Sequence, residues 1–142
     1  NERGERVDWV TMGQSMKIIA TYEVSPGERV RDMLVGFGLN TVRNVAITDL
    51  ANLFSGDYFE GEVPRRGRVE CFVPRLPLNR GIYTYNVIAR TTGLEVEDYV
   101  VHAGRFNVEA GDFFGTGRIP DSQRLIMMDQ KWKLLAEEPM TL

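Results

Sequence analysis

The stretch YTYNVIA, residues 83–89, decides the fold, because its apolar side chains recur at every second position. In an extended strand this period places Tyr83, Tyr85 and Val87 on one face and their neighbours on the other. The same alternation runs through residues 16–22, 33–39, 45–47, 69–73 and 106–108, and turns rich in Gly, Pro and Asn separate these segments. Short alternating segments with turns between them predict an all-β protein, an antiparallel β-sandwich or barrel.

The size and composition of the chain fit one globular domain. Its 142 residues can bury a core of their own, and 43% hydrophobic with 26% charged residues excludes a disordered or fibrous chain. No apolar run approaches the roughly 18 residues of a membrane span. Cys71 is the one cysteine, which excludes an internal disulfide and fits a reducing compartment. The chain begins at Asn1 with no signal-like segment, so we expect a piece of a longer protein.

The charge balance argues against a nucleic-acid partner, because the net charge is -3. Of the 17 basic residues, the lysines are Lys17, Lys131 and Lys133, and the rest are arginines. Arginine binds carboxylates bidentately and stacks on flat apolar faces, which suits ligand binding. Compositional bias is the simpler interpretation of the same excess.

The residues that most catalytic sites require are missing from the sequence. The sequence contains no phosphate-binding loop with a lysine before Ser or Thr. Gly36 and Gly38 form an isolated Gly-x-Gly inside a strand pattern, where they are better explained as small residues on one strand face. One cysteine and one histidine, His102, are too few for a zinc site. Carboxylates are plentiful, so the residue types leave open a catalytic acid/base pair of the kind that glycosidases use. We therefore predict a binding or assembly module that is not an enzyme and uses no cofactor and no metal.

A candidate sugar-binding surface follows from the alternation itself. Sugar-binding sites offer apolar faces together with a few amide, hydroxyl and charged groups. If the apolar set of residues 83–89 faces the core, the intervening side chains face outward, and Phe72 does so if Val69 and Val73 point inward. The candidate glycan-binding residues are Phe72, Thr84, Asn86, Ile88 and Arg90, on strands expected to be neighbours. Ordinary solvent-exposed surface is the equally open alternative.

Two segments resist interpretation by pattern. Residues 123–135 place Leu125, Met128 and Trp132 at helical spacing, so helix and strand both stay open. Residues 52–67, which include Pro64, read as the longest irregular connection and could carry a functional loop.

Three longer stretches resemble a known family. They are GRVECFVPRLPLNRGIYTYNVIA (residues 67–89), AGRFNVEAGDFFGTGRIP (residues 103–120) and LIMMDQKWKL (residues 125–134). Together with MGQSMKIIATYE (residues 12–23), they resemble the C-terminal domain of Wzt-type ATPase subunits, from ABC transporters that export O-antigen and related polysaccharides. The resemblance covers residues 10–134, with residues 1–9 as a partial first strand or a linker from an ATPase domain and residues 135–142 as a tail.

The resemblance implies an immunoglobulin-like sandwich that dimerises by exchanging its C-terminal strand. The residues implied in exchange are Leu125, Met127, Trp132 and Leu134. It also implies non-catalytic recognition of a lipid-linked polysaccharide at its modified non-reducing end, so that finished chains are exported. The implied partners are the protein's own ATPase domain and a membrane transporter subunit, at the cytoplasmic side of the inner membrane. No glycan-binding residue carries over by motif, and a dimerisation module that reads no sugar is the alternative.

Overall fold

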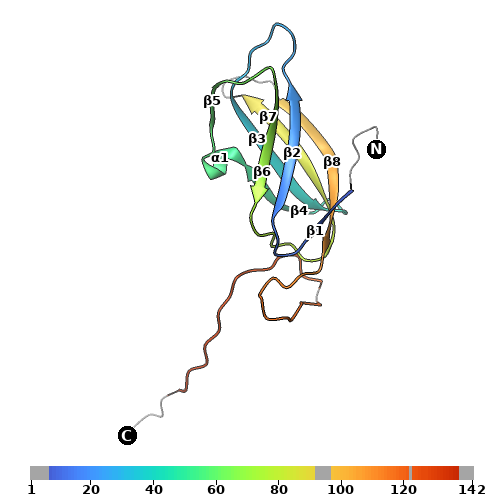
Figure 1. Cartoon of the computed structure of the whole chain (residues 1–142), viewed down its shortest axis with the longest axis vertical. Helices are drawn as coiled ribbons and strands as arrows, with labels where there is room; N and C mark the ends of the chain where they lie inside the picture. The colour runs from blue at the N-terminus through green and yellow to red at the C-terminus, as the bar shows by residue number, and fades with distance from the viewer. Residues whose placement is uncertain (1–6, 92–96, 122, 138–142) are drawn as a thin grey trace.

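The computed structural model describes residues 7–91, 97–121 and 123–137, and in these ranges the chain is almost entirely β (Figure 1). The elements are β1 (Val7–Thr11), β2 (Met16–Glu23), β3 (Arg31–Thr41), β4 (Ala46–Ala51), α1 (Asn52–Ser55), β5 (Phe59–Glu62), β6 (Arg66–Val73), β7 (Gly81–Thr91) and β8 (Glu97–Glu109). No helix in the described ranges is long and apolar enough to cross a membrane.

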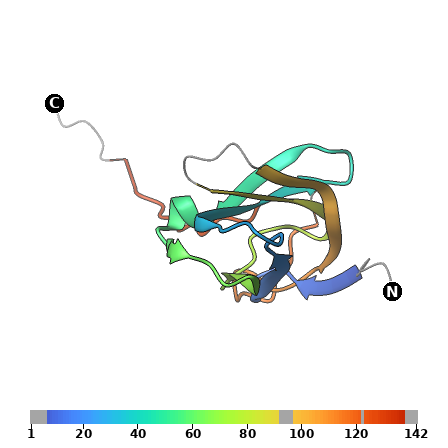
Figure 2. The same cartoon turned by 90° about the horizontal axis from the view of Figure 1, so that it is seen from above.

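The strands form two facing sheets (Figure 2). The large sheet has the order β1-β8-β7-β3-β4, with β5 also paired to β3, and the small sheet pairs β2 with β6. The β-sandwich expected from the alternating pattern is confirmed. One pair departs from the expected antiparallel arrangement, because β1 runs parallel to the C-terminal half of β8.

The core fills the space between the sheets. Phe37 and Tyr83 of the large sheet face Met16 and Ile18 of the small one, and all four are buried. The Tyr83 ring stacks on Phe106 at 5.6 Å between centroids, and its hydroxyl donates to the Asn79 carbonyl over 2.7 Å. Burial raises the pKa of the Tyr83 hydroxyl, because the surroundings disfavour its charged form. The alternation of residues 83–89 therefore has its predicted orientation.

The expectation of an irregular connection over residues 52–67 is wrong. This segment contains α1, β5 and the start of β6. The side-chain amide of Asn52 holds the start of this segment against β3. Its Oδ1 accepts from Val35 N over 2.9 Å, and its Nδ2 donates to Met33 O over 3.2 Å. Further along, Gly61 N donates to the Asp32 carboxylate over 2.7 Å and holds β5 against β3. Such long-range hydrogen bonds leave no local pattern in the sequence.

The helix that residues 123–135 could form is not found. This segment is extended, and a single bridge joins Ile126 to Leu78. Met127 is the residue that turns into the core, with 7% of its surface exposed. Residues at helical spacing, such as Met128 and Trp132, are exposed instead. The exchanged strand stays a prediction, as does the division of the chain at residues 10 and 134; residues 138–142 of the expected tail lie outside the described ranges.

Candidate functional site

Two hollows lie on either side of β4. The first, the outer groove, is a depression of about 270 Å³ on the solvent face of the large sheet, between β4, β3, β7 and α1. The second, the inter-sheet cleft, has a volume of about 670 Å³ and opens between the two sheets, where β4 faces β6. Their chemistry differs, because the outer groove has polar side chains on its rim and the inter-sheet cleft is mainly apolar.

The floor of the outer groove consists of two glycines of β3. Because Val35 and Phe37 face the core, Gly36 and Gly38 face outward. Gly38 lies between Asn86 of β7 and Asp49 of β4 in the strand register, so the three residues form one row across the sheet. A Cβ on Gly38 would lie 3.4 Å from Asp49 Oδ1. The absence of these two side chains thus creates a trough with side chains on both flanks.

The rim of the outer groove combines polar groups with an apolar wall. Asp49 and Asn86 flank Gly38, and Arg90 lies opposite Leu34 at the end of the trough. Phe54 of α1 is largely exposed and closes one side. A carboxylate accepts hydrogen bonds at two oxygens, an amide donates and accepts, and a guanidinium donates several in a plane. The groove can therefore hold a ligand that carries both hydroxyl groups and a C–H face.

The structure brings together three of the five predicted glycan-binding residues. Asn86, Ile88 and Arg90 all line the outer groove. Thr84 lies further along the same face of β7, and its Oγ1 is buried without a hydrogen-bond partner among the described residues. Phe72 is exposed on β6, as its alternation predicts, but it belongs to the small sheet and lines the inter-sheet cleft.

The expected neighbourhood of Phe72 and β7 is wrong for a topological reason. Consecutive strands β6 and β7 belong to different sheets, because the chain crosses from one sheet to the other through residues 74–80. Sequence reasoning also missed Asp49 and Phe54. The alternating pattern predicts that Gly36 and Gly38 face outward. It does not predict that β4 pairs with β3 beside them.

The inter-sheet cleft is mainly apolar. Its walls include Phe37 and Leu50 on the large sheet and Val69 and Cys71 on β6, which is an edge strand within the described part of the chain. Burial raises the pKa of the Cys71 thiol, and the negative charge of Asp57 adds to the effect. The thiol is therefore protonated at neutral pH, which agrees with an inert side chain rather than a nucleophile.

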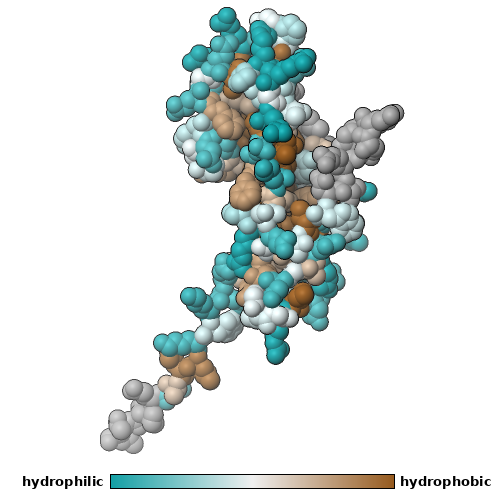
Figure 3. Space-filling model, in the orientation of Figure 1, coloured by the Kyte–Doolittle hydropathy of each residue, from teal (hydrophilic) through white to brown (hydrophobic). Residues whose placement is uncertain are grey.

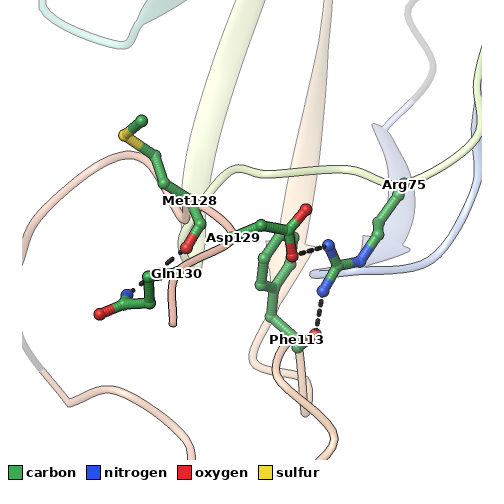
Figure 4. A network of polar contacts seen from close by, with 5 residues as sticks. All are labelled: Arg75, Phe113, Met128, Asp129 and Gln130. Atoms are coloured by element: carbon green, nitrogen blue, oxygen red, sulfur yellow. Dashed lines mark hydrogen bonds and ion pairs between the residues drawn. The ribbon is translucent and has the colours of Figure 1, made fainter. Parts of the chain in front are cut away.

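The C-terminal segment is fastened to the sandwich as far as Asp129 (Figure 4). The Arg75 guanidinium donates to Asp129 Oδ1 over 2.5 Å and to the Phe113 carbonyl, and it lies 3.5 Å above the centre of the Phe113 ring. Met127 N donates to the Pro77 carbonyl over 2.6 Å, and the Leu125 carbonyl accepts from Asn79 N over 2.8 Å. Backbone hydrogen bonds thus hold Leu125 and Met127 against the sandwich of the same chain.

Beyond Asp129 the chain leaves the sandwich and runs toward the lower left of Figure 1. Trp132 is 90% exposed and Leu134 is 98% exposed. Apolar residues are visible on this segment in the space-filling view (Figure 3). Of the four residues implied in exchange, Leu125 and Met127 are therefore bonded to the sandwich of the same chain, whereas Trp132 and Leu134 are exposed to solvent.

Comparisons with known proteins identify the fold. No protein-family model matches the chain, and no curated protein matches its sequence. The fold matches a solved structure described as the crystal structure of the C-terminal domain of Wzt, with a TM-score of 0.63. The match covers 89% of this chain and 73% of that chain, at 10% sequence identity. The likeness confirms the resemblance at the level of the fold.

Proposed function

We propose that this domain binds a lipid-linked O-antigen polysaccharide in the outer groove, without catalysing a reaction. The observation that carries the proposal is the glycine trough, where Asp49, Asn86 and Arg90 surround an open floor next to the exposed Phe54. Sugars present hydroxyl groups around their edges and C–H groups on their faces, so they need this combination of polar rim and apolar wall. The resemblance to Wzt-type domains and the shared fold support the same ligand class.

The role in export follows from the resemblance. In this proposal the groove receives the modified non-reducing end of the chain, so that finished polysaccharide is selected for transport. The domain acts beside its own ATPase domain and a membrane transporter subunit, on the cytoplasmic side of the inner membrane. Single sugar contacts are weak, and two sites in a dimer would raise the apparent affinity through effective concentration.

The proposed dimer forms by exchange of the segment after Asp129. Trp132 and Leu134 are exposed in a single subunit, although burying such side chains stabilises a protein by about 1.5–3 kcal/mol each. The backbone of β6 offers an unpaired edge within the described chain, beside the apolar inter-sheet cleft. An edge strand of this kind accepts a further strand. The proposal therefore places the segment of one subunit on β6 of its partner.

Glycan binding is tested by shortening the groove residues. Asn86→Ala and Arg90→Ala should each weaken binding of the source bacterium's own O-polysaccharide about tenfold, since each removes hydrogen bonds to a desolvated ligand. Arg68→Ala is the matched control, because Arg68 is an exposed arginine on the small sheet. Affinity is measured by calorimetry with capped and uncapped polysaccharide. Unchanged affinity of both groove variants would remove the groove from the site.

The exposed C-terminal segment favours a second candidate, an assembly module that reads no sugar. Truncation after Asp129 keeps the anchored residues and removes Trp132 and Leu134. If exchange makes the dimer, light scattering should show a folded monomer. A folded dimer after this truncation contradicts the exchange. Failure of the intact protein to bind either capped or uncapped polysaccharide would favour assembly as the whole function.

A further inference from the structure

The outer groove is one end of a longer row of side chains, the outer stripe, which follows β7 from end to end. β7 pairs with β3 over Tyr83 to Thr91 without a register shift, so its side chains alternate regularly between the two faces. The outer stripe consists of Ile82, Thr84, Asn86, Ile88 and Arg90. From Ile82 to Arg90 the strand rises about 27 Å, at about 3.4 Å per residue. The outer groove occupies the half of the stripe near Arg90.

Beside the other end of the outer stripe, two strands away on β1, lies an exposed tryptophan, Trp9. Trp9 of β1 pairs with Asn107 of β8, and Asn107 pairs with Ile82, so the three residues form one row across three strands. Val10 and Val108, the next residues along, pack against the core, which turns Trp9 and Asn107 outward. Trp9 is 66% exposed and Ile82 is 48% exposed. Two exposed apolar side chains thus lie about 10 Å apart, at two strand spacings, with Asn107 between them.

Thr84 and Asn86 make the middle of the outer stripe polar. Thr84 pairs with the exposed Arg105 of β8, and Asn86 pairs with Gly38, which in turn pairs with Asp49. The Thr84 Oγ1 has no hydrogen-bond partner among the described residues, although buried polar atoms normally have one. Along β7 the outer stripe therefore runs from the apolar Ile82 through polar residues to Ile88 and Arg90, with Phe54 beside the far end.

We propose that Trp9 and Ile82 form a second sugar subsite, so that the ligand is a stretch of several sugars rather than a terminal cap alone. This inference rests on the proposed function of the outer groove. The chain end lies in the groove, the following sugars pass over Thr84 and Arg105, and a later ring stacks on Trp9. A tryptophan offers a large flat face with only two side-chain torsions to immobilise, which makes it an effective anchor.

Fluorescence reports directly on this subsite, because Trp9 and Trp132 are the two tryptophans of the chain. In a Trp132→Phe protein, Trp9 is the remaining indole. The probe is O-polysaccharide released by mild acid from the source bacterium's lipopolysaccharide and separated by size. Fractions long enough to span the outer stripe should protect Trp9 from acrylamide quenching. The shortest fractions that still bind should leave its quenching unchanged.

Affinity provides the second readout. Trp9→Ala and Ile82→Ala should weaken binding of long fractions roughly tenfold and leave short fractions unaffected. Ile19→Ala is the matched control, since Ile19 is 46% exposed on the small sheet. Binding of long fractions with unchanged quenching of Trp9 and unchanged affinity of Trp9→Ala would overturn the subsite and leave the proposed function standing. If no fraction binds the intact protein, both proposals fail.

Discussion

Filling the glycine trough should separate stability from binding, and Gly38→Ala is the change that does so. A Cβ on Gly38 would meet Asp49 Oδ1 at 3.4 Å, Asn86 Nδ2 at 3.7 Å and Asn86 Cβ at 3.9 Å, which are ordinary van der Waals contacts. The added methyl group therefore fits without displacing backbone. It occupies the floor of the outer groove, where the proposed ligand lies.

The two expected effects have opposite signs. Glycine inside a strand costs about 0.5–1 kcal/mol relative to alanine, because the unfolded chain loses more freedom on folding. Gly38→Ala should therefore raise the free energy of unfolding by this amount, which for a domain of this size corresponds to a rise in melting temperature of about 2–4 °C. Glycan affinity should fall about tenfold, since a ring resting on Gly38 must move off its floor. A variant that is more stable yet binds more weakly cannot owe its loss of binding to unfolding.

The assays are scanning calorimetry and titration with O-polysaccharide on the same preparation. Ala46→Val serves as the control, because Ala46 is exposed on β4 and lines neither hollow. Gly36→Ala extends the test, since its Cβ would lie 3.2 Å from Ile88 Cγ2 and requires a small shift of that side chain. Undiminished affinity of Gly38→Ala would refute the idea that the ligand contacts the trough.

Further predictions concern what holds the site in place. Asn52→Ala should lower the free energy of unfolding by about 1–3 kcal/mol, measured by urea denaturation, because it leaves two backbone groups of β3 without partners; an unchanged midpoint would contradict this. Arg75→Ala should speed proteolysis after residue 125 several-fold by removing the contacts to Asp129 and Phe113, whereas Arg118→Ala should not. The raised pKa of Cys71 means that the folded protein holds its thiol proton longer than the unfolded chain does. Stability should therefore fall as pH rises above about 9 and fall less in Cys71→Ala, as followed by melting temperature; equal slopes would refute it.

The alternating pattern predicted the strands and their faces because it records what each side chain contacts. Tyr83 is buried and Asn86 faces out, as the pattern of residues 83–89 requires. The same pattern cannot say which strands become neighbours. Phe72 has the predicted orientation but lies on the small sheet, since pairing depends on contacts between residues far apart in sequence.

The parts that sequence reasoning missed depend on such distant contacts. Asp49 enters the site only because β4 pairs with β3 in one particular register. Phe54 reaches the groove because the Asn52 side chain bonds the backbone of β3 and sets the position of α1. The apolar residues of the C-terminal segment follow a helical spacing, yet the bonds of Met127 and Asp129 to the sandwich keep the segment extended.

The two hollows share a wall, which ties the two proposed activities to each other. Asp49, Ala51, Asn52 and Phe54 line both the outer groove and the inter-sheet cleft. A partner segment seated beside β6 would contact one side of this wall, while a sugar in the outer groove contacts the other. If the segment and the sugar hold the wall in the same position, each lowers the entropy cost of binding the other, and this coupling is reciprocal. Exchange of the C-terminal segment would then strengthen glycan binding at each site, beyond the benefit of presenting two sites together.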